Sequence, residues 1–309
     1  MILNEFISLT RDRLAKRIAP KENIVVPEKG IEASHPNGHF YSPVTDPAEM
    51  EAESDRIWPS DVIDVPGIDL NKSSHEYVLR DVFPKYINEF DYSDEGNSDE
   101  LLTQFYIRNS QFSWLDARAL FVLLREWRPK KIIEVGSGYS TILMHDVNMR
   151  FLNGATDVTA IEPYPRPFLE KLDGVKLIQE KVQQVSLDVF KALDAGDILF
   201  IDSSHVSKTG SDVNHLLFAV LPILRRGVRV HVHDIFLPVD YPREWVIDEN
   251  RSWNEQYVLR ALLMYSAKFR VLFGCMNAFL NHKELLSAAI QRPIESLYGG
   301  SSLWLEIAQ

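Results

Sequence analysis

From Ser113 onward the chain alternates short apolar segments with longer amphipathic ones, and this alternation constrains its fold more than any other feature. The short segments have the length and composition of buried strands, whereas the longer ones carry apolar residues at helical spacing. Parallel strands joined by helices are covered on both faces, which is why such strands are apolar throughout. The alternation therefore predicts an α/β domain with a doubly wound, mostly parallel sheet.

Seven strands and six helices are expected in this region. The expected strands are residues 131–135, 157–161, 175–179, 197–201, 228–232, 270–273 and 303–307. The expected helices are residues 116–127, 140–149, 166–172, 187–195, 212–224 and 253–269.

The first third of the chain has a different composition. From Lys21 to about Asn97 it is rich in Pro, Gly, Asp and Ser, and long stretches lack clear periodicity. One helix is expected near residues 75–90. We therefore expect residues 1–112 to form an irregular, partly helical N-terminal cap on an α/β domain of residues 113–309.

The charge and the cysteine content of the chain limit its possible binding partners and its covalent cross-links. The 33 Lys and Arg residues against 44 Asp and Glu residues give a net charge of -11, which repels nucleic acid and anionic membranes. A single cysteine, Cys275, excludes an internal disulfide. No apolar run approaches the roughly 20 residues of a membrane helix, and residues 1–20 suit an amphipathic surface helix better than a signal peptide. A cytoplasmic protein with a small-molecule partner is expected, and a homo-oligomer stays open.

Polar and ionisable residues stand at the ends of four expected strands. In an open parallel sheet, ligands bind outside the carboxyl ends of the strands, so these residues are the candidates for a site. They are Glu134 with Gly136, Ser137, Gly138 and Ser140, then Glu162, then Asp202 to His205, and finally His233 and Asp234.

The first of these strand ends suggests a nucleotide-like ligand. Gly136 and Gly138 allow a tight strand-to-helix turn in which the backbone can approach a ligand. Thr141 stands where the dinucleotide fingerprint has its third glycine. Glu134 suits a cationic ligand, and the Glu162 carboxylate can accept hydrogen bonds from both hydroxyls of a ribose.

With Asp202 at the fourth strand end, these residues resemble the S-adenosylmethionine site of class I methyltransferases. The resemblance covers residues 113–309. The segments at 201–205 (IDSSH) and 227–234 resemble a bacterial subgroup of metal-dependent sugar O-methyltransferases, which includes mycinamicin methyltransferase, and the cephalosporin hydroxylase-like proteins. The resemblance implies a Rossmann-like methyltransferase sheet of seven strands whose last pair is antiparallel.

The same resemblance implies how the cofactor is held. The glycine loop would pass beneath the methionine part of S-adenosylmethionine, with Glu134 near its ammonium and Glu162 on the ribose. The backbone around Val182 would meet the adenine. The implied cofactor-binding residues are Glu134, Gly136, Ser137, Gly138, Ser140, Glu162, Val182 and Asp202.

Methyl transfer to a hydroxyl requires removal of its proton. His205 follows Asp202 by three residues, and an unperturbed histidine pKa of about 6.5 suits a general base. In the sugar O-methyltransferases this loop supplies a metal-binding aspartate and the candidate base, so His205 and Asp202 are the expected catalytic residues. Asp202, His233 and Asp234 could hold Mg²⁺ or Mn²⁺, although two aspartates and a histidine also form an ordinary polar edge.

Acceptor contacts are expected from the loops beyond Asp234, where aromatic and polar residues suited to sugar rings occur: Tyr241, Trp245, Trp253 and Asn254. The leading hypothesis is an S-adenosylmethionine-dependent O-methyltransferase that acts on a small molecule such as a sugar or a glycosylated metabolite. A nicotinamide-dependent oxidoreductase on a similar sheet, a non-catalytic cofactor-binding protein and a hydroxylase-like enzyme are the alternatives. His231, deeper along its strand, is expected to be a buried, hydrogen-bonded histidine.

Overall fold

The computed structural model describes residues 33–61, 64–96, 104–292 and 299–309. The chain divides into two compact units. The described part of the first unit is residues 33–61 with Val239–Ser252, and the second unit holds the other described residues. The amphipathic helix expected at residues 1–20 lies outside the described residues.

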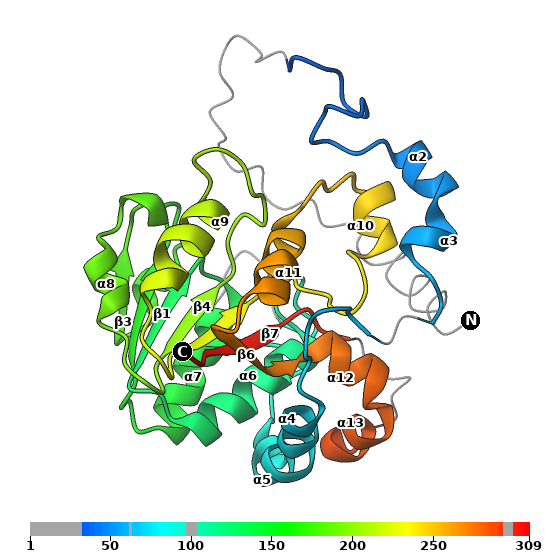
Figure 1. Ribbon diagram of the computed structural model, residues 1–309. Helices are drawn as coiled ribbons and strands as arrows, with labels where there is room; N and C mark the ends of the chain where they lie inside the picture. The colour runs from blue at the N-terminus through cyan, green and yellow to red at the C-terminus, as the bar shows by residue number, and fades with distance from the viewer. Residues whose placement is uncertain (1–32, 62–63, 97–103, 293–298) are drawn as a thin grey trace. The chain divides into compact units, whose positions relative to one another are not determined.

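The second unit is built on a seven-stranded sheet (Figure 1) with the order β3-β2-β1-β4-β5-β7-β6. The first five strands run parallel, and β7 is antiparallel to β5 and β6. The strands are β1 (Lys131–Val135), β2 (Asp157–Ile161), β3 (Val175–Ile178), β4 (Ile198–Ile201), β5 (Arg229–Val232), β6 (Phe269–Gly274) and β7 (Leu303–Ile307). The doubly wound, mostly parallel sheet expected from the sequence is therefore confirmed.

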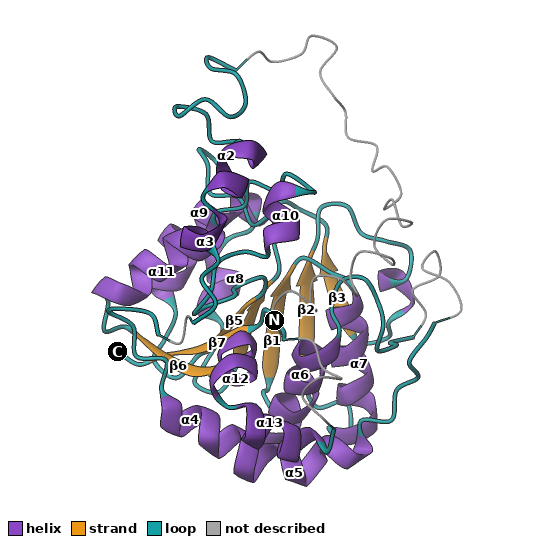
Figure 2. Ribbon diagram, turned by 90° about the vertical axis from the view of Figure 1, so that its right-hand side faces the viewer, coloured by secondary structure: helices purple, strands orange, loops and turns teal. Residues whose placement is uncertain are grey.

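Helices cover both faces of this sheet. Helices α6 and α7 lie on one face, and α8 and α9 lie on the other (Figures 1 and 2). Among its described residues this unit has the helices α4 (Lys72–Tyr77), η1 (Val78–Val82), α5 (Phe83–Tyr86), η2 (Ile87–Glu89), α6 (Trp114–Trp127), α7 (Tyr139–Phe151), η3 (Leu169–Lys171), η4 (Val182–Gln184), α8 (Leu187–Lys191), α9 (Asp212–His215), η5 (Leu216–Val220), η6 (Leu221–Ile223), α11 (Glu255–Tyr265), α12 (Cys275–Asn281) and α13 (Lys283–Ile290). No helix among the described residues is long and apolar enough to cross a membrane.

One prediction is wrong: the helix expected at residues 166–172 does not form. Only a single 3₁₀ turn, Leu169–Lys171, forms there. Three prolines, Pro163, Pro165 and Pro167, precede this turn. Proline lacks the backbone donor of a helix and disfavours helical geometry in the residue before it, so the apolar spacing of this segment does not produce a longer helix.

Alternate residues of the central strands face opposite layers. Ile133 and Leu199 belong to a buried apolar cluster that includes Val213 of α9 and Leu259 of α11. On the other face, the ring of Phe200 stacks on the fully buried His231 at a centroid distance of 3.7 Å. The sheet is therefore apolar on one face, whereas its other face carries a histidine into the core.

The register of the strands brings their carboxyl ends to one level. Val135, the last residue of β1, pairs with Ile161 of β2 and with Ile201 of β4. Ile201 in turn pairs with Val232, the last residue of β5. The polar residues that follow these strands are therefore neighbours along one edge of the sheet.

The described part of the first unit contains three short helices: α2 (Pro47–Ala52), α3 (Ser54–Ile57) and α10 (Arg243–Ile247). The indole Nε1 of Trp58 donates to the carbonyl of Tyr241 at 2.8 Å, and Arg243 forms an ion pair with Glu51. The structure thus groups the chain differently from the expected division at residue 112. Residues 64–96 and 104–112 lie with the sheet, and Val239–Ser252 joins the N-terminal residues.

Strand β6 lies at one end of the sheet, and the start of α4 covers its free edge. Asn71 Nδ2 donates to the carbonyl of Val271 at 2.7 Å, and Ser74 Oγ donates to that of Leu272 at 2.6 Å. His75 Nε2 accepts from the backbone N–H of Gly274 at 2.8 Å. These side chains satisfy backbone groups that an exposed edge would leave open to another chain.

We predict that Asn71→Ala lowers the free energy of unfolding by about 2 kcal/mol, because it removes the bond to Val271 and the N-cap of α4, and places alanine at a positive φ. Urea denaturation measures the loss. Ser73→Ala is the matched control, because the exposed Ser73 hydroxyl donates only to Asn71. Equal losses in the two variants would contradict this role for Asn71.

Candidate active site

The turn after β1 and the end of β4 touch through their backbones. The N–H of Asp202 donates to the carbonyl of Val135 at 2.9 Å. Gly136 has a φ of +91°, and a Cβ atom there would lie 2.0 Å from the carbonyl oxygen of Asp202. Only glycine fits, because both the left-handed backbone and the close approach exclude a side chain.

Glu134 lies beneath this turn and organises it. The side chain is fully buried, and its two carboxylate oxygens accept from Ser140 Oγ and Thr141 Oγ1, each at 2.7 Å. Thr141 Oγ1 also accepts from the backbone N–H of Gly138 at 3.0 Å. Burial raises the pKa of Glu134 to about 8. Its contact with a cofactor ammonium stays a prediction.

The residues expected to contact the ribose and the adenine, Glu162 and Val182, follow the next two strands, β2 and β3. Glu162 is partly buried; one carboxylate oxygen accepts from the N–H of Tyr164 at 2.9 Å, and the other accepts from Ser137 Oγ at 3.4 Å. Glu162 is therefore held beside the glycine turn. Val182 is buried and begins η4.

A loop before α6 lies over the glycine turn. Asn109 fixes this loop, because its amide donates to the carbonyls of Tyr106 and Phe112 and its oxygen accepts from the N–H groups of Gln111 and Phe112. Gln111 is thereby placed over the turn: its Oε1 lies 3.2 Å from the position of a Cβ on Gly138. Gln111 is not among the site residues predicted from the sequence.

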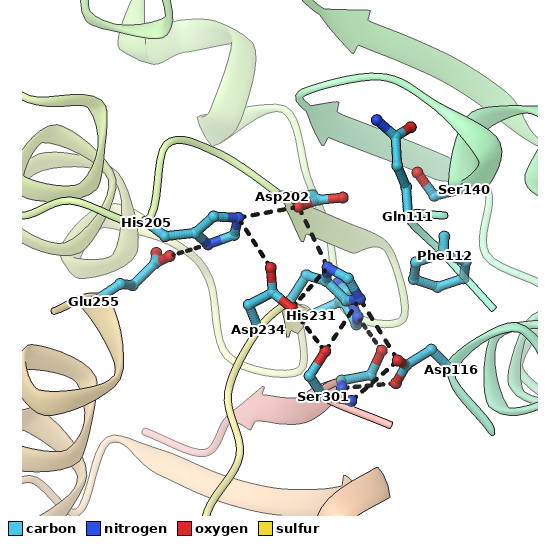
Figure 3. A network of polar contacts seen from close by, with 12 residues as sticks. Gln111, Phe112, Asp116, Ser140, Asp202, His205, His231, Asp234, Glu255 and Ser301 are labelled. Carbon is cyan, nitrogen blue, oxygen red and sulfur yellow. Dashed lines mark hydrogen bonds and ion pairs between the residues drawn. The ribbon is translucent and has the colours of Figure 1, made fainter. Parts of the chain in front are cut away.

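His205 lies among three carboxylates (Figure 3). Its Nδ1 is 3.0 Å from Glu255 Oε2, and its Nε2 is 3.5 Å from Asp202 Oδ1 and 3.3 Å from Asp234 Oδ2. The ring of Trp253 lies against it at a centroid distance of 4.4 Å. Burial alone would lower the pKa of His205, but the bonds to Asp202 and Glu255 outweigh it and raise the pKa to about 10.

His233 faces the same pair of aspartates from the other side. Its Nδ1 is 3.4 Å from Asp202 Oδ1 and 3.6 Å from Asp234 Oδ1. Although burial opposes the charged form, Asp234 and Asp202 raise the pKa of His233 well above its usual value. Burial would raise the pKa of Asp202, yet His233 and His205 lower it. The group is thus a compact set of charges of both signs.

This group has the composition of a cation site. Asp202, His233 and Asp234 each offer one ligand atom, and these atoms lie within 4.8 Å of one another. Asp202 is partly exposed, whereas His233 and Asp234 are buried. The expected metal residues are therefore brought together, and His205 lies beside them. His231 is the buried, hydrogen-bonded histidine expected, with its Nε2 2.8 Å from Ser302 Oγ.

The four residues expected to contact an acceptor fall in both units. Trp253 and Asn254 accompany His205: the side-chain oxygen of Asn254 accepts from the N–H of Ser207 at 2.5 Å, and its backbone N–H donates to the carbonyl of His205 at 3.1 Å. Tyr241 and Trp245 belong to the first unit. There, the Arg251 guanidinium lies over the Trp245 ring at 4.2 Å. Acceptor binding by any of the four stays a prediction.

Three residues that the sequence analysis did not identify complete the group: Asp116, Glu255 and Ser301. Asp116 lies in the first turn of α6, Glu255 is the first residue of α11, and Ser301 precedes β7. In the sequence, each of them stands out only as a polar residue beside a strongly apolar segment. Such residues are common at helix and strand starts, so the signal is weak.

Residues 133–235 match the family described as a methyltransferase domain. The matched stretch runs from β1 to the residue after Asp234, and it contains the glycine turn, Glu162 and the loop with His205. With the seven-stranded sheet, this match identifies a methyltransferase domain of Rossmann-like fold. It sets aside the nicotinamide-dependent alternative.

The chain belongs to the same family as an uncharacterised protein of Archaeoglobus fulgidus. The two are 35% identical over 182 residues, which is 56% of this chain and 81% of the archaeal protein. The chain is also similar to methyltransferase PaMTH1 of Podospora anserina, solved with bound SAH, at 16% identity and a TM-score of 0.40, over 90% of this chain and all of that one. PKMT2 of Rickettsia typhi, solved with AdoHcy, is similar at 11% identity and a TM-score of 0.33, over 59% of this chain and 49% of that one. Similarities as distant as the last two assign no residue and no acceptor.

We predict that Gly136→Ala is far more destabilising than Gly174→Ala. Both glycines have a positive φ, so both substitutions cost the roughly 1–2 kcal/mol of a left-handed backbone. At Gly174 nothing lies within 4 Å of the new Cβ, whereas at Gly136 the carbonyl of Asp202 must move. Chemical denaturation compares the two variants, and similar losses would show that the close approach of β1 and β4 is not needed.

Proposed function

We propose that this methyltransferase transfers a methyl group from S-adenosylmethionine to the hydroxyl of a small molecule, such as a sugar or a glycosylated metabolite. The observation that carries the proposal is the position of His205. Its Nδ1 is engaged by Glu255, and its Nε2 faces Asp202 and Asp234 at 3.5 and 3.3 Å. Asp202 also touches the glycine turn, so a base and a cofactor loop share one strand end.

The strand ends suggest how the cofactor would lie. The turn from Gly136 to Ser140 would pass beneath its methionine part, and the Glu162 carboxylate would accept hydrogen bonds from the ribose. Val182, one strand further along the sheet edge, would meet the adenine. Glu134 would place negative charge below the ammonium, because a cation above the turn favours the ionised form of a buried carboxyl.

The reaction is an in-line displacement in which positioning supplies much of the rate. The acceptor oxygen attacks the methyl carbon, the C–S bond breaks, and its electron pair stays on sulfur to give S-adenosylhomocysteine. The hydroxyl proton passes to Nε2 of His205. Glu255 holds the proton on Nδ1, so that Nε2 is the basic atom.

The residues around His205 fit a divalent cation. Two carboxylates and one imidazole nitrogen suit Mn²⁺ or another transition metal better than Mg²⁺, which prefers oxygen ligands alone. Held by Asp202, His233 and Asp234, such an ion would polarise the acceptor hydroxyl and offset the negative charge that keeps His205 protonated.

The acceptor would be held by Trp253 and Asn254, which lie beside His205. A net charge of -11 favours a small-molecule acceptor over nucleic acid or a membrane surface.

We predict that S-adenosylhomocysteine raises the melting temperature of the purified protein and that NADH does not. Glu162→Ala should weaken S-adenosylhomocysteine binding by about 10-fold or more, because two hydrogen bonds to a charged group are lost. Isothermal titration calorimetry measures this, with Glu170→Ala as the control, since Glu170 is exposed in the 3₁₀ turn Leu169–Lys171. A variant that binds as tightly as wild type would remove Glu162 from the cofactor site.

We predict that His205→Ala and Glu255→Gln each lower kcat by about 10²-fold or more and leave S-adenosylhomocysteine binding unchanged. The assay follows radiolabelled methyl transfer from S-adenosylmethionine, with Mn²⁺ present, to a panel of free and glycoside-linked sugars. Glu284→Gln is the control, because Glu284 occupies the first turn of α13 and is exposed. Near-normal turnover of His205→Ala with an accepted sugar would exclude His205 as the base.

A further inference from the structure

The hydroxyl of Ser301 bridges two of the residues proposed to hold a cation. Ser301 Oγ donates to Asp234 Oδ1 at 2.9 Å and lies 3.3 Å from His233 Nε2. A serine hydroxyl has one proton and two lone pairs, so it can donate to the aspartate while it accepts from the imidazole N–H. Ser301 is buried, with 6% of its surface exposed, so water does not compete for these bonds.

Asp116 holds Ser301 in this place. One of its carboxylate oxygens accepts from the N–H of Ser301 at 3.0 Å, and the other accepts from that of Ser302 at 2.7 Å. Its Oδ2 also lies 3.6 Å from His233 Nε2. A Cβ atom on Gly300 would approach Asp116 Oδ1 to 2.3 Å, so the glycine leaves room for the carboxylate.

These contacts decide which nitrogen of His233 faces the aspartates. The Nε2–H is directed toward Ser301 and Asp116, so that Nδ1 points at Asp202 and Asp234. A histidine that binds a metal through one nitrogen usually donates its other N–H to a carboxylate or another acceptor, which fixes its ring. The arrangement around His233 has that form, and Asp234 is fixed by the same hydroxyl.

We propose that Ser301, held by Asp116, is the positioning residue of a transition-metal site formed by Asp202, His233 and Asp234. The proposal rests on the cation included in the proposed function. It adds that the segment before β7 and the start of α6 set the geometry of ligands that belong to β4 and β5. Removing such a supporting contact typically lowers metal affinity by 10- to 100-fold.

Ser302 offers a matched control. It is the next residue, it is as deeply buried as Ser301, and its hydroxyl contacts the Nε2 of His231 and interacts with the Asp116 carboxylate. Ser302→Ala therefore removes a buried serine hydroxyl bonded to a histidine, but one that does not touch the proposed ligands. Asp116→Asn is a second test, because the Ser301 and Ser302 N–H groups bond different carboxylate oxygens and one of these becomes an NH2 group, which cannot accept.

The experiment titrates Mn²⁺ into the full chain after chelator treatment and dialysis, and follows the free ion by electron paramagnetic resonance. Ser301→Ala and Asp116→Asn should weaken Mn²⁺ binding by about 10- to 100-fold, whereas Ser302→Ala should bind it as wild type does. S-adenosylhomocysteine binding, measured on the same samples, should stay unchanged in all three variants.

Three results would overturn the proposal. Wild-type affinity for Mn²⁺ in Ser301→Ala would show that the hydroxyl does not position the site. Equal loss in Ser302→Ala, with loss of S-adenosylhomocysteine binding, would assign the effect to packing. Wild-type protein that binds S-adenosylhomocysteine but not Mn²⁺ would remove the metal site and leave the methyltransferase assignment intact.

Discussion

The close contact between the ends of β1 and β4 is the constraint on which the site depends. A glycine at position 136 lets the carbonyl of Asp202 approach to a distance that any side chain would block, and the Asp202 N–H is bonded to Val135. The glycine turn and the loop with His205 therefore meet through their backbones. In a close-packed junction neither loop can move far without displacing the other.

Burying several charges at this junction carries a cost. Removing carboxylates and imidazolium groups from water is unfavourable unless each finds a partner, and breaking one pair leaves a charge without compensation. His205 and His233 both face the pair Asp202 and Asp234, and each histidine has a further carboxylate behind it, Glu255 or Asp116. Such a network favours one arrangement of its members over all others, and it orients two imidazole nitrogens toward the same point.

Much of the fold could be predicted from the sequence, because it depends on local patterns. Strands β1, β2 and β7 have the bounds that the apolar runs predict, and the polar residues after β1, β2, β4 and β5 do lie along one edge. The helix predicted at residues 166–172 does not form, because the prolines in and before this segment outweigh its apolar spacing.

The supporting residues could not be predicted in the same way. Asp116, Glu255 and Ser301 reach the site from segments up to 185 residues apart in sequence, as the bond between Ser301 and Asp116 shows. No spacing rule connects such segments, since their proximity follows from how α6, α11 and β7 pack on the sheet. Asp116 was visible in the sequence only as a polar residue in an apolar helix.

The same segments also hold the strained backbone of the site. His205 and Asp234 have φ values of 60° and 55°, a conformation that costs a residue with a side chain roughly 1–2 kcal/mol. The carbonyl of His205 accepts from the N–H groups of Asn254 and Glu255, and the N–H of Ile235, next to Asp234, donates to the carbonyl of Ser301. The residues before β7 and at the start of α11 lie outside the stretch that matches the methyltransferase domain. The matched stretch thus contains the glycine turn, whereas the orientation of the two histidines depends on parts of the chain outside it.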